Sequence, residues 1–362
     1  MCWYAIDNIG SVDSPGLVIY RERVAANIKA LTGMVDDLSK LRPHVKTNKM
    51  KEVSRMLLDA GIRKFKCATI AEAEMLAMVG APDVLLAHQP VGPKQERLLA
   101  LCDAYPATLF SCIVDNILTA EQLSALAMRG RRTLDVLIDL NVGMNRTGIQ
   151  PEQAYELFKV LLSLPGIRVQ GIHVYDGHIR ETDLAKRREF VDAAFEKTTC
   201  LLANLEEPVK IVAGGSPSFP VHATRKGVEC SPGTFIFWDW KYRHILPDEP
   251  FDYAALVITR IISVINDQLI CLDLGHKAIA AENPFPRVHF LNMPEAEAIS
   301  QSEEHLVVRI QNTAGHQVGD VWYGVPEHIC PTVALYQQAY VVEDQQVIGK
   351  WDIVARNRSI SI

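Results

Sequence analysis

A lysine close to the end of an apolar run is the first residue of this chain with the means to do chemistry. It lies in LRPHVKTNKM, where Lys46 follows His44 by two positions. Side chains alternate along a strand, so these two residues would share one face. Burial makes a lysine amine nucleophilic, as Schiff-base chemistry requires. The spacing also fits a solvated lysine, like the nearby Lys49 and Lys51.

Two glycine-containing turns have the composition of a phosphate site. In IVAGGSPSF (211–219) a glycine pair directly follows an apolar run, and successive amides with Ser216 or Ser218 could cradle an anion. The second turn, SPGTFIF (231–237), is predicted to enter a strand. Each turn alone is also an ordinary tight turn, but two of them late in the chain resemble the phosphate cup of a barrel. The predicted phosphate contacts are Gly214, Gly215, Ser216, Gly233 and Thr234.

Two further segments carry candidate ligands. In DLNVGMNRTG, Arg146 follows a predicted strand and could pair with a phenolate or carboxylate, although a loop arginine is more often solvated. In PEHICPT, His328 and Cys330 would project to one side of an extended chain. An imidazole and a thiolate suit zinc or a similar divalent ion. Because zinc sites usually carry four ligands, a buried core thiol is the competing interpretation.

The elements that would position these residues alternate between short apolar runs and helical patterns from Leu17 to about Ser216. This alternation predicts βα units and a parallel sheet. About eight such units would close into a (β/α)8 barrel of the TIM type, whose site lies where the strands end. A doubly wound sheet is the alternative, but GxGxxG is missing after the first run. The predicted strands are LVIY (17–20), LRPHVK, FKCAT, DVLLAHQ, TLFSCIVD, LDVLIDLN, VQGIHVY and KIVAGG.

The pattern of apolar runs changes after about Pro247. ALVITRIISVI, QLICLDL, HLVVRIQ and AYVVEDQQVIGKWDIVA are β-rich and separated by turn residues, which predicts an antiparallel β domain. We therefore expect a barrel over residues 14–247. The β-rich domain is expected to comprise residues 248–362 together with residues 1–13.

The composition limits the classes of binding partner that are expected for this chain. The formal net charge of −6 predicts no general electrostatic attraction to nucleic acid or to an anionic membrane. No secretory signal is visible, and no stretch approaches ~20 uninterrupted apolar residues. The 8 cysteines include no CxxC pair, as expected for free thiols in a reducing compartment. The expected location is the cytoplasm.

Together these segments resemble the D-threonine aldolase and D-serine dehydratase family, which is related to bacterial alanine racemase and belongs to the fold III pyridoxal-phosphate enzymes. The resemblance runs from about residue 14 to residue 358. RPHVKT is similar to the family's cofactor-lysine motif, which implies that Lys46 holds pyridoxal 5'-phosphate. VGMNRTG implies that Arg146 lies near the cofactor's phenolic oxygen or the substrate. VYDGH implies that Tyr175 faces the pyridine nitrogen.

The remaining motifs complete the resemblance. GGSPS and SPGTF look like the phosphate-binding turns, and HICPT looks like the site where a histidine and a second residue hold a divalent metal (Zn, Mn or Mg). The family often reads RPHxKTHK, whereas this chain has Asn48. The HxC spacing is similar to the dehydratase pattern, since some aldolases carry an aspartate there. Residues 64–92 look closer to sequences labelled D-threonine-aldolase-like.

The resemblance implies a lyase that acts on D-3-hydroxy amino acids, with the metal as a Lewis acid on the substrate's β-hydroxyl. Retro-aldol cleavage to glycine and an aldehyde is the main expectation, with His178 as a candidate base. Dehydration of D-serine or D-3-hydroxyaspartate, with Lys46 deprotonating Cα, is the first alternative. A metal-independent amino-acid racemase and a non-catalytic carrier of the cofactor are two others, although the β-rich domain argues against the carrier. A homodimer is also implied.

Overall fold

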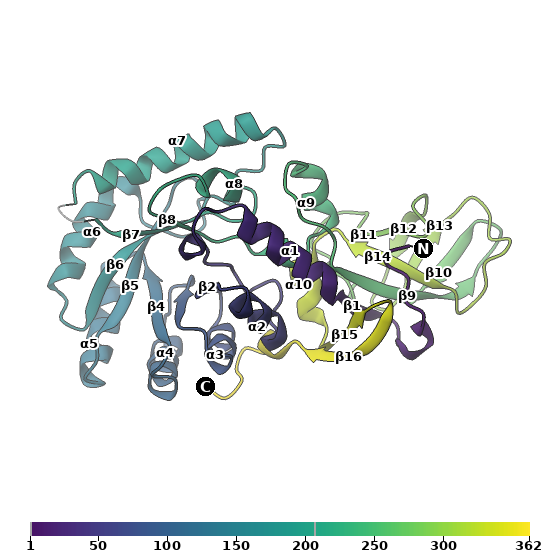
Figure 1. Cartoon of the computed structure of the whole chain (residues 1–362), viewed down its shortest axis with the longest axis horizontal. Coiled ribbons are helices and arrows are strands. Elements are labelled where there is room, and N and C mark those ends of the chain that lie inside the picture. Colours follow the sequence, from purple (N-terminus) through teal and green to yellow (C-terminus); the bar gives the residue numbers. More distant parts are fainter. Residues whose placement is uncertain (1, 206–207) are drawn as a thin grey trace. The chain divides into compact units, whose positions relative to one another are not determined.

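The computed structural model describes residues 2–205 and 208–362 (Figure 1). The chain divides into two compact units, each assembled from segments that are separate in the sequence. The sheet unit comprises residues 2–30, 47–53 and 234–356. The barrel unit comprises residues 31–46, 54–205, 208–233 and 357–362. The predicted domain boundary at residues 247–248 stays a prediction.

The barrel unit is built on a parallel sheet of 7 strands in the order β2-β3-β4-β5-β6-β7-β8. The sequence predicted a parallel sheet from apolar runs separated by helices, which is confirmed. It expected about eight strands, however, and did not include β8. Every residue of β5 is buried, as expected for a strand covered on both faces. The strands are β2 (Lys64–Cys67), β3 (Asp83–Leu86), β4 (Leu109–Val114), β5 (Leu134–Leu140), β6 (Ile167–Val174), β7 (Lys210–Ala213) and β8 (Val228–Cys230).

A short extended segment, residues 41–45, joins the two edges of this sheet. It bridges β8 through Leu41 and Cys230, and it bridges β2 through His44 and Lys66. The amide of Val45 donates to the carbonyl of Lys66 at 2.9 Å. The predicted strand LRPHVK therefore forms isolated bridges rather than a full strand, but it closes the parallel sheet into a barrel.

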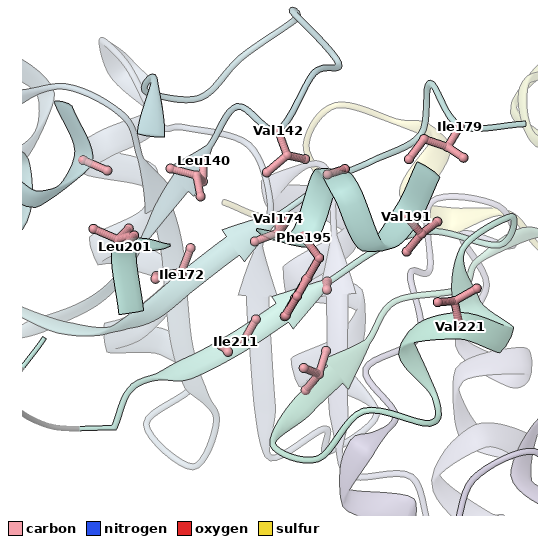
Figure 2. Packing of buried hydrophobic residues seen from close by; sticks show 14 residues of the cluster. Leu140, Val142, Ile172, Val174, Ile179, Val191, Phe195, Leu201, Ile211 and Val221 are labelled. Atoms are coloured by element: carbon pink, nitrogen blue, oxygen red, sulfur yellow. The ribbon is translucent and has the colours of Figure 1, made fainter. Parts of the chain in front are cut away.

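Helices follow the barrel strands and pack on their outer surface. Helix α3 begins where Thr69 accepts a hydrogen bond from the amide of Glu72 at 3.1 Å. Figure 2 shows Phe195 and Val191 of α7 packed with Val174 and Ile211 from the neighbouring strands β6 and β7. The helices are α3 (Ile70–Met78), α4 (Pro93–Ala104), α5 (Ile117–Arg129), α6 (Pro151–Ser163), α7 (Leu184–Leu202) and α8 (Phe219–His222).

Inside the barrel, one apolar layer is made by Leu85, Ile113, Leu137 and Val212. Each comes from a different strand, and side chains two residues further along a strand point the same way. Polar residues that lie an even number of positions from these apolar residues, toward the ends of the strands, therefore also point into the barrel. The apolar layer is the floor on which the candidate site rests.

The sheet unit contains a mostly antiparallel sheet of 9 strands, ordered β12-β13-β10-β9-β1-β15-β16, with β14 pairing β9 and β11. This confirms the predicted β-rich domain. Its strands are β1 (Gly16–Tyr20), β9 (Ala255–Val264), β10 (Leu269–Leu272), β11 (Val288–Phe290), β12 (Glu297–Gln301), β13 (Leu306–Arg309), β14 (Val321–Pro326), β15 (Gln338–Glu343) and β16 (Gln346–Asp352).

Strand β1 corrects one expectation. The run LVIY (17–20) was predicted as the first strand of the barrel, which is wrong, because it lies between β9 and β15 of the other sheet. Val18 pairs with Leu256 of β9 and with Tyr340 of β15. All five residues of β1 are buried, so an apolar run of this kind fits the centre of either sheet.

Short helices complete the chain. The strand predicted within SPGTFIF is wrong, since this segment forms the 3-10 helix η3 (Thr234–Ile236). In the described residues no helix is long and apolar enough to cross a membrane. The other helices are η1 (Ile9–Ser11), α1 (Arg21–Gly33), η2 (Leu38–Lys40), α2 (Lys51–Asp59), α9 (Trp240–Ile245), α10 (Ile329–Leu335) and η4 (Val354–Arg356).

Candidate active site

The candidate lysine lies directly after the segment that closes the barrel. Lys46 is half-buried, and its backbone amide donates to Nδ1 of His44 at 3.2 Å. Its Nζ is 5.9 Å from the centre of the Tyr175 ring. Tyr175 immediately follows β6, so both residues lie where barrel segments end.

A second cation faces the same aromatic ring. The guanidinium carbon of Arg146 is 4.8 Å from the centre of the Tyr175 ring. Its loop turns back because Asn141 accepts hydrogen bonds from the amides of Gly143 and Asn145, both at 3.1 Å. The structure thus brings together three residues that the sequence singled out separately, Lys46, Arg146 and Tyr175. Two cations around one ring suit an anionic ligand.

The glycine pair after β7 is required by close packing. A Cβ on Gly215 would lie 3.1 Å from Cε2 of Tyr175. Gly214 has φ +75°, and a Cβ there would lie 2.7 Å from Oγ of Ser218 and 2.7 Å from the His222 ring. A larger residue at position 214 would therefore be strained and would displace the serine. Glycine at position 214 therefore lets this turn form without strain.

The buried carboxylate of Asp176 holds the glycine turn through two hydrogen bonds. Asp176 accepts a hydrogen bond from Oγ of Ser218 at 2.6 Å and one from Nε2 of His222 at 2.8 Å. Ser218 in turn accepts from the amide of Gly215 at 3.2 Å. Burial alone would raise the pKa of Asp176, but the hydrogen bonds from His222 and Ser218 hold it below its ordinary value. The carboxylate therefore stays charged and fixes the shape of the turn.

The two predicted turns lie next to each other in the barrel unit. The amide of Gly233 donates to Oγ of Ser216 at 3.4 Å. Between them, the hydroxyl of Ser231 is buried and has no hydrogen-bond partner among the described residues. A buried hydroxyl without a partner beside a glycine turn fits a phosphate oxygen as its missing partner. The donor set therefore fits a phosphorylated cofactor.

A polar chain inside the barrel was not predicted from the sequence. Lys66, His173 and Asp139 are each at most 4% exposed. Nζ of Lys66 lies 3.3 Å from Nε2 of His173, and Nδ1 of His173 lies 2.7 Å from Oδ1 of Asp139. Nζ of Lys66 is also 5.6 Å from the centre of the Tyr175 ring. A third basic side chain therefore faces the ring beside Lys46 and Arg146.

The predicted metal ligands lie in the sheet unit. His328 immediately precedes α10 and Cys330 lies in its first turn, so the expected extended chain is wrong at this point. Sγ of Cys330 lies 3.0 Å from Oγ1 of Thr47 and 3.5 Å from Oγ1 of Thr234. Nδ1 of His328 lies 2.6 Å from Oε1 of Glu282. Thr234, predicted as a phosphate contact, lies beside this thiol within the sheet unit.

His328 has acidic neighbours that raise the pKa of its imidazole. Burial lowers its pKa, but the neighbouring Cys330, Asp239 and Glu282 outweigh burial and raise the pKa to about 9. Asp239 itself is fully enclosed, and burial raises its pKa to about 6. Within residues 2–205 and 208–362, no group of three or more His, Cys, Asp or Glu residues has the arrangement of a metal site. Metal binding at His328 and Cys330 therefore stays a prediction.

His178, the predicted base, is exposed. A Cβ on Gly143 would lie 2.9 Å from its Nε2, so the imidazole lies against the arginine loop. His178 lines a pocket of about 520 Å³ together with Arg180, Glu181 and Lys197. Lys46 and Tyr175 are not among the residues lining this pocket, so the structure does not bring His178 and Lys46 together there.

The barrel, with its lysine and its glycine-containing turns, points to a class of protein, and comparison with known families identifies that class. Residues 19–239 match the family described as the alanine racemase N-terminal domain, and this chain belongs to that family. Residues 254–342 match the putative serine dehydratase domain. The alanine-racemase-like fold III architecture, and with it the resemblance to pyridoxal-phosphate lyases, is therefore confirmed.

Individual relatives carry more specific names. A D-threonine aldolase of Arthrobacter sp is 28% identical over 365 residues, covering 98% of this chain and 95% of the relative. A D-threo-3-hydroxyaspartate dehydratase of Delftia sp. (strain HT23) is 26% identical over 270 residues, covering 71% and 69%. The crystal structure of D-threonine aldolase from Filomicrobium marinum shares the fold, with a TM-score of 0.88, 24% identity, and coverage of 95% of this chain and 96% of that one.

Proposed function

We propose that this protein is a pyridoxal-phosphate-dependent, divalent-metal-assisted lyase that cleaves D-3-hydroxy amino acids, most directly D-threonine to glycine and acetaldehyde. The observation that carries the proposal is the grouping of Lys46 and Arg146 around Tyr175. The full-length similarity to a D-threonine aldolase supports the choice of substrate.

The barrel unit supplies the groups that the cofactor needs. Lys46 would attach it through the side-chain amine, Tyr175 would face the ring nitrogen, and Arg146 would pair with the phenolic oxygen or the substrate carboxylate. When bound, pyridoxal phosphate withdraws electrons from the substrate's Cα. The residues proposed to hold its phosphate are Gly214, Gly215, Ser216 and Gly233 of this unit, together with Thr234, which belongs to the sheet unit.

The sheet unit supplies the proposed metal ligands, His328 and Cys330. A divalent ion held there, zinc, manganese or magnesium, would polarise the substrate's β-hydroxyl as a Lewis acid. Glu282, whose Oε1 lies 2.6 Å from Nδ1 of His328, would orient the imidazole that holds the ion. His178 stays the candidate base for the hydroxyl proton, although its exposure calls for a direct test by substitution.

Product analysis tests the proposal. Purified protein is supplied with pyridoxal phosphate and Mn²⁺ or Zn²⁺ and offered D-threonine and D-serine separately. Glycine and acetaldehyde in equal amounts from D-threonine are the expected products. The same protein after chelation, and the Cys330→Ala variant, should lose this activity while keeping the bound cofactor. Full activity after chelation would refute the metal role, and no cleavage of either substrate would refute the lyase.

Dehydration is the second candidate function. Its support is a cysteine two positions after the histidine at the proposed metal site, together with the similarity to a D-threo-3-hydroxyaspartate dehydratase. Here Lys46 would take the Cα proton and the β-hydroxyl would leave. Ammonia and a 2-oxo acid, rather than glycine and an aldehyde, would establish this reaction.

A homodimer and a cytoplasmic location are further proposals that rest on the family resemblance. Light scattering during size-exclusion chromatography of the cofactor-loaded protein should give twice the mass of one chain. A mass of one chain would contradict the dimer.

A further inference from the structure

The buried polar chain inside the barrel has no role in the function proposed so far. Lys66 lies on β2 and shares its parity with Leu85 of the apolar floor, to which it is paired. Its ammonium group is buried, only 2% of the residue being exposed. Burying a lysine is expensive, so a lysine at this position calls for an explanation in the site it faces.

The hydrogen bonds fix which atom donates to which. Oδ2 of Asp139 accepts from Oγ1 of Thr147 at 2.8 Å. Burial raises the pKa of Asp139, but hydrogen bonds from His173 and Thr147 bring it below its ordinary value, so the carboxylate is charged. It must then accept from Nδ1–H of His173, which leaves Nε2 without a proton. Nε2 is therefore an acceptor for Lys66, and the chain runs from carboxylate to imidazole to lysine.

The imidazole stays neutral in this chain. Burial and the charge of Lys66 lower the pKa of His173, and they outweigh the opposing effect of Asp139. A neutral acceptor holds the lysine in place whether or not the amine is protonated, because both forms can donate a hydrogen bond. The position of Nζ of Lys66, 5.6 Å from the centre of the Tyr175 ring, is therefore fixed by hydrogen bonding.

Four charged groups act on Lys66 besides the imidazole. Burial and then the charge of Lys46 lower its pKa to about 7, with Arg146 acting in the same direction. Asp139 and Asp176 favour its charged form. An anionic phosphate or phenolate at the site would favour it further, because opposite charges stabilise one another in a poorly solvated interior.

We propose that Lys66, held by the Asp139–His173 pair, is a positioning residue of the cofactor site whose ammonium sets the pH at which the cofactor attached to Lys46 changes its protonation. The inference rests on the proposed attachment of pyridoxal phosphate to Lys46. A positive charge next to the attachment point disfavours a further proton there. Lys66 therefore moves this change toward lower pH.

A spectroscopic titration tests the proposal. The visible absorbance of the cofactor-loaded protein is followed against pH for the wild type, Lys66→Met and Lys66→Gln. Both neutral variants should move the midpoint upward by about one pH unit or more, since a like charge has been removed. Both should fold, because replacing a buried charge by a neutral side chain of similar length relieves its desolvation. Midpoints equal to that of the wild type would overturn the proposal.

Two controls separate the possible failures. Lys210→Met removes a lysine from the other end of a barrel strand, where its Nζ is 4.0 Å from Asp83, and should leave the midpoint unchanged. An equal shift in this control would overturn a local effect of Lys66. Loss of the visible absorbance in Lys46→Ala supports the attachment site. Its persistence there would overturn the proposed cofactor site, whereas unchanged midpoints with a Lys46-dependent absorbance would overturn only the role of Lys66.

Discussion

More basic than acidic side chains face the ring of Tyr175. Lys46, Lys66 and Arg146 face the ring, whereas Asp139 and Asp176 are both engaged in hydrogen bonds with histidine and hydroxyl side chains. An anionic ligand there would meet cations that are already in place. Preorganised charge of this kind lowers the cost of binding a phosphorylated cofactor, because little has to rearrange.

At the residue scale, Asp176 is the test of the glycine turn. Asp176→Asn removes the carboxylate that holds Ser218 and His222, so the turn should loosen. We expect the dissociation constant for pyridoxal phosphate to rise about tenfold, or about 1.4 kcal/mol. We also expect the free energy of unfolding to fall by about 3 kcal/mol at neutral pH. Equilibrium dialysis and urea denaturation measure the two effects.

The sign of the pH dependence provides a further check on Asp176. Its pKa in the folded protein is lowered, so its contribution to stability is present at neutral pH and is lost as the pH falls below the ordinary aspartate value of about 4. The variant should therefore lose less stability on acidification than the wild type. Asp192→Asn, at a more exposed ion pair with Arg225, is the matched control and should change neither property. Unchanged cofactor affinity in Asp176→Asn would contradict the role of the turn.

Local motifs made some of these residues predictable. The glycine pair and the lysine of RPHVKT were visible because they stand in short, distinctive segments. Lys66 was not, because FKCAT reads as an ordinary strand, and only closure of the barrel places position 66 inside. His173 and Asp139 were missed for the same reason, since their pairing across β5 and β6 depends on the register of the sheet.

At the element scale, an ion-pair network ties the closing segment to the neighbouring barrel strands. Arg42, in the closing segment, donates to both carboxylate oxygens of Asp83 at 2.7 and 2.9 Å. Its Nε also donates to Glu229 at 2.6 Å. The network connects β3 and β8 through the closing segment that immediately precedes Lys46. Its integrity therefore matters for the position of the candidate lysine.

Arg42→Met tests this element. It leaves Asp83 and Glu229 largely buried without their main partner, which should cost about 3–5 kcal/mol of unfolding free energy in urea denaturation. Arg21→Met breaks an exposed pair with Glu343 and should cost less than about 1 kcal/mol. Equal effects of the two substitutions would contradict a special role for the network in closing the barrel.

Element types were easier to predict than element partners. The apolar runs located most strands of both sheets, because buried strands leave an apolar signature. They missed β8, β11, β12 and β14; β8 and β11 have only 3 residues each, and no residue of β12 is buried. The same signature misassigned β1, since five buried residues do not reveal which sheet they join. The turn before η3 was predicted to enter a strand because its aromatic and β-branched residues favour strands, whereas the structure buries them in a helical turn.

At the scale of the whole molecule, each unit is assembled from separate stretches of the chain. Apart from Thr234, the residues proposed to hold the cofactor belong to the barrel unit, and those proposed to hold the metal belong to the sheet unit. A reaction that needs both groups would therefore need both units. A protein that binds pyridoxal phosphate but has lost the metal ligands should keep its colour and lose its lyase activity.

The attachment of the cofactor to Lys46 is the central claim, and borohydride reduction tests it most directly. Reduction of the protein loaded with pyridoxal phosphate converts the C=N bond to the lysine into a stable C–N bond, and peptide mass spectrometry then locates the modified residue. The account predicts modification of Lys46 and its absence in Lys46→Ala. Modification of Lys66 in the wild type, or of no lysine at all, would contradict it.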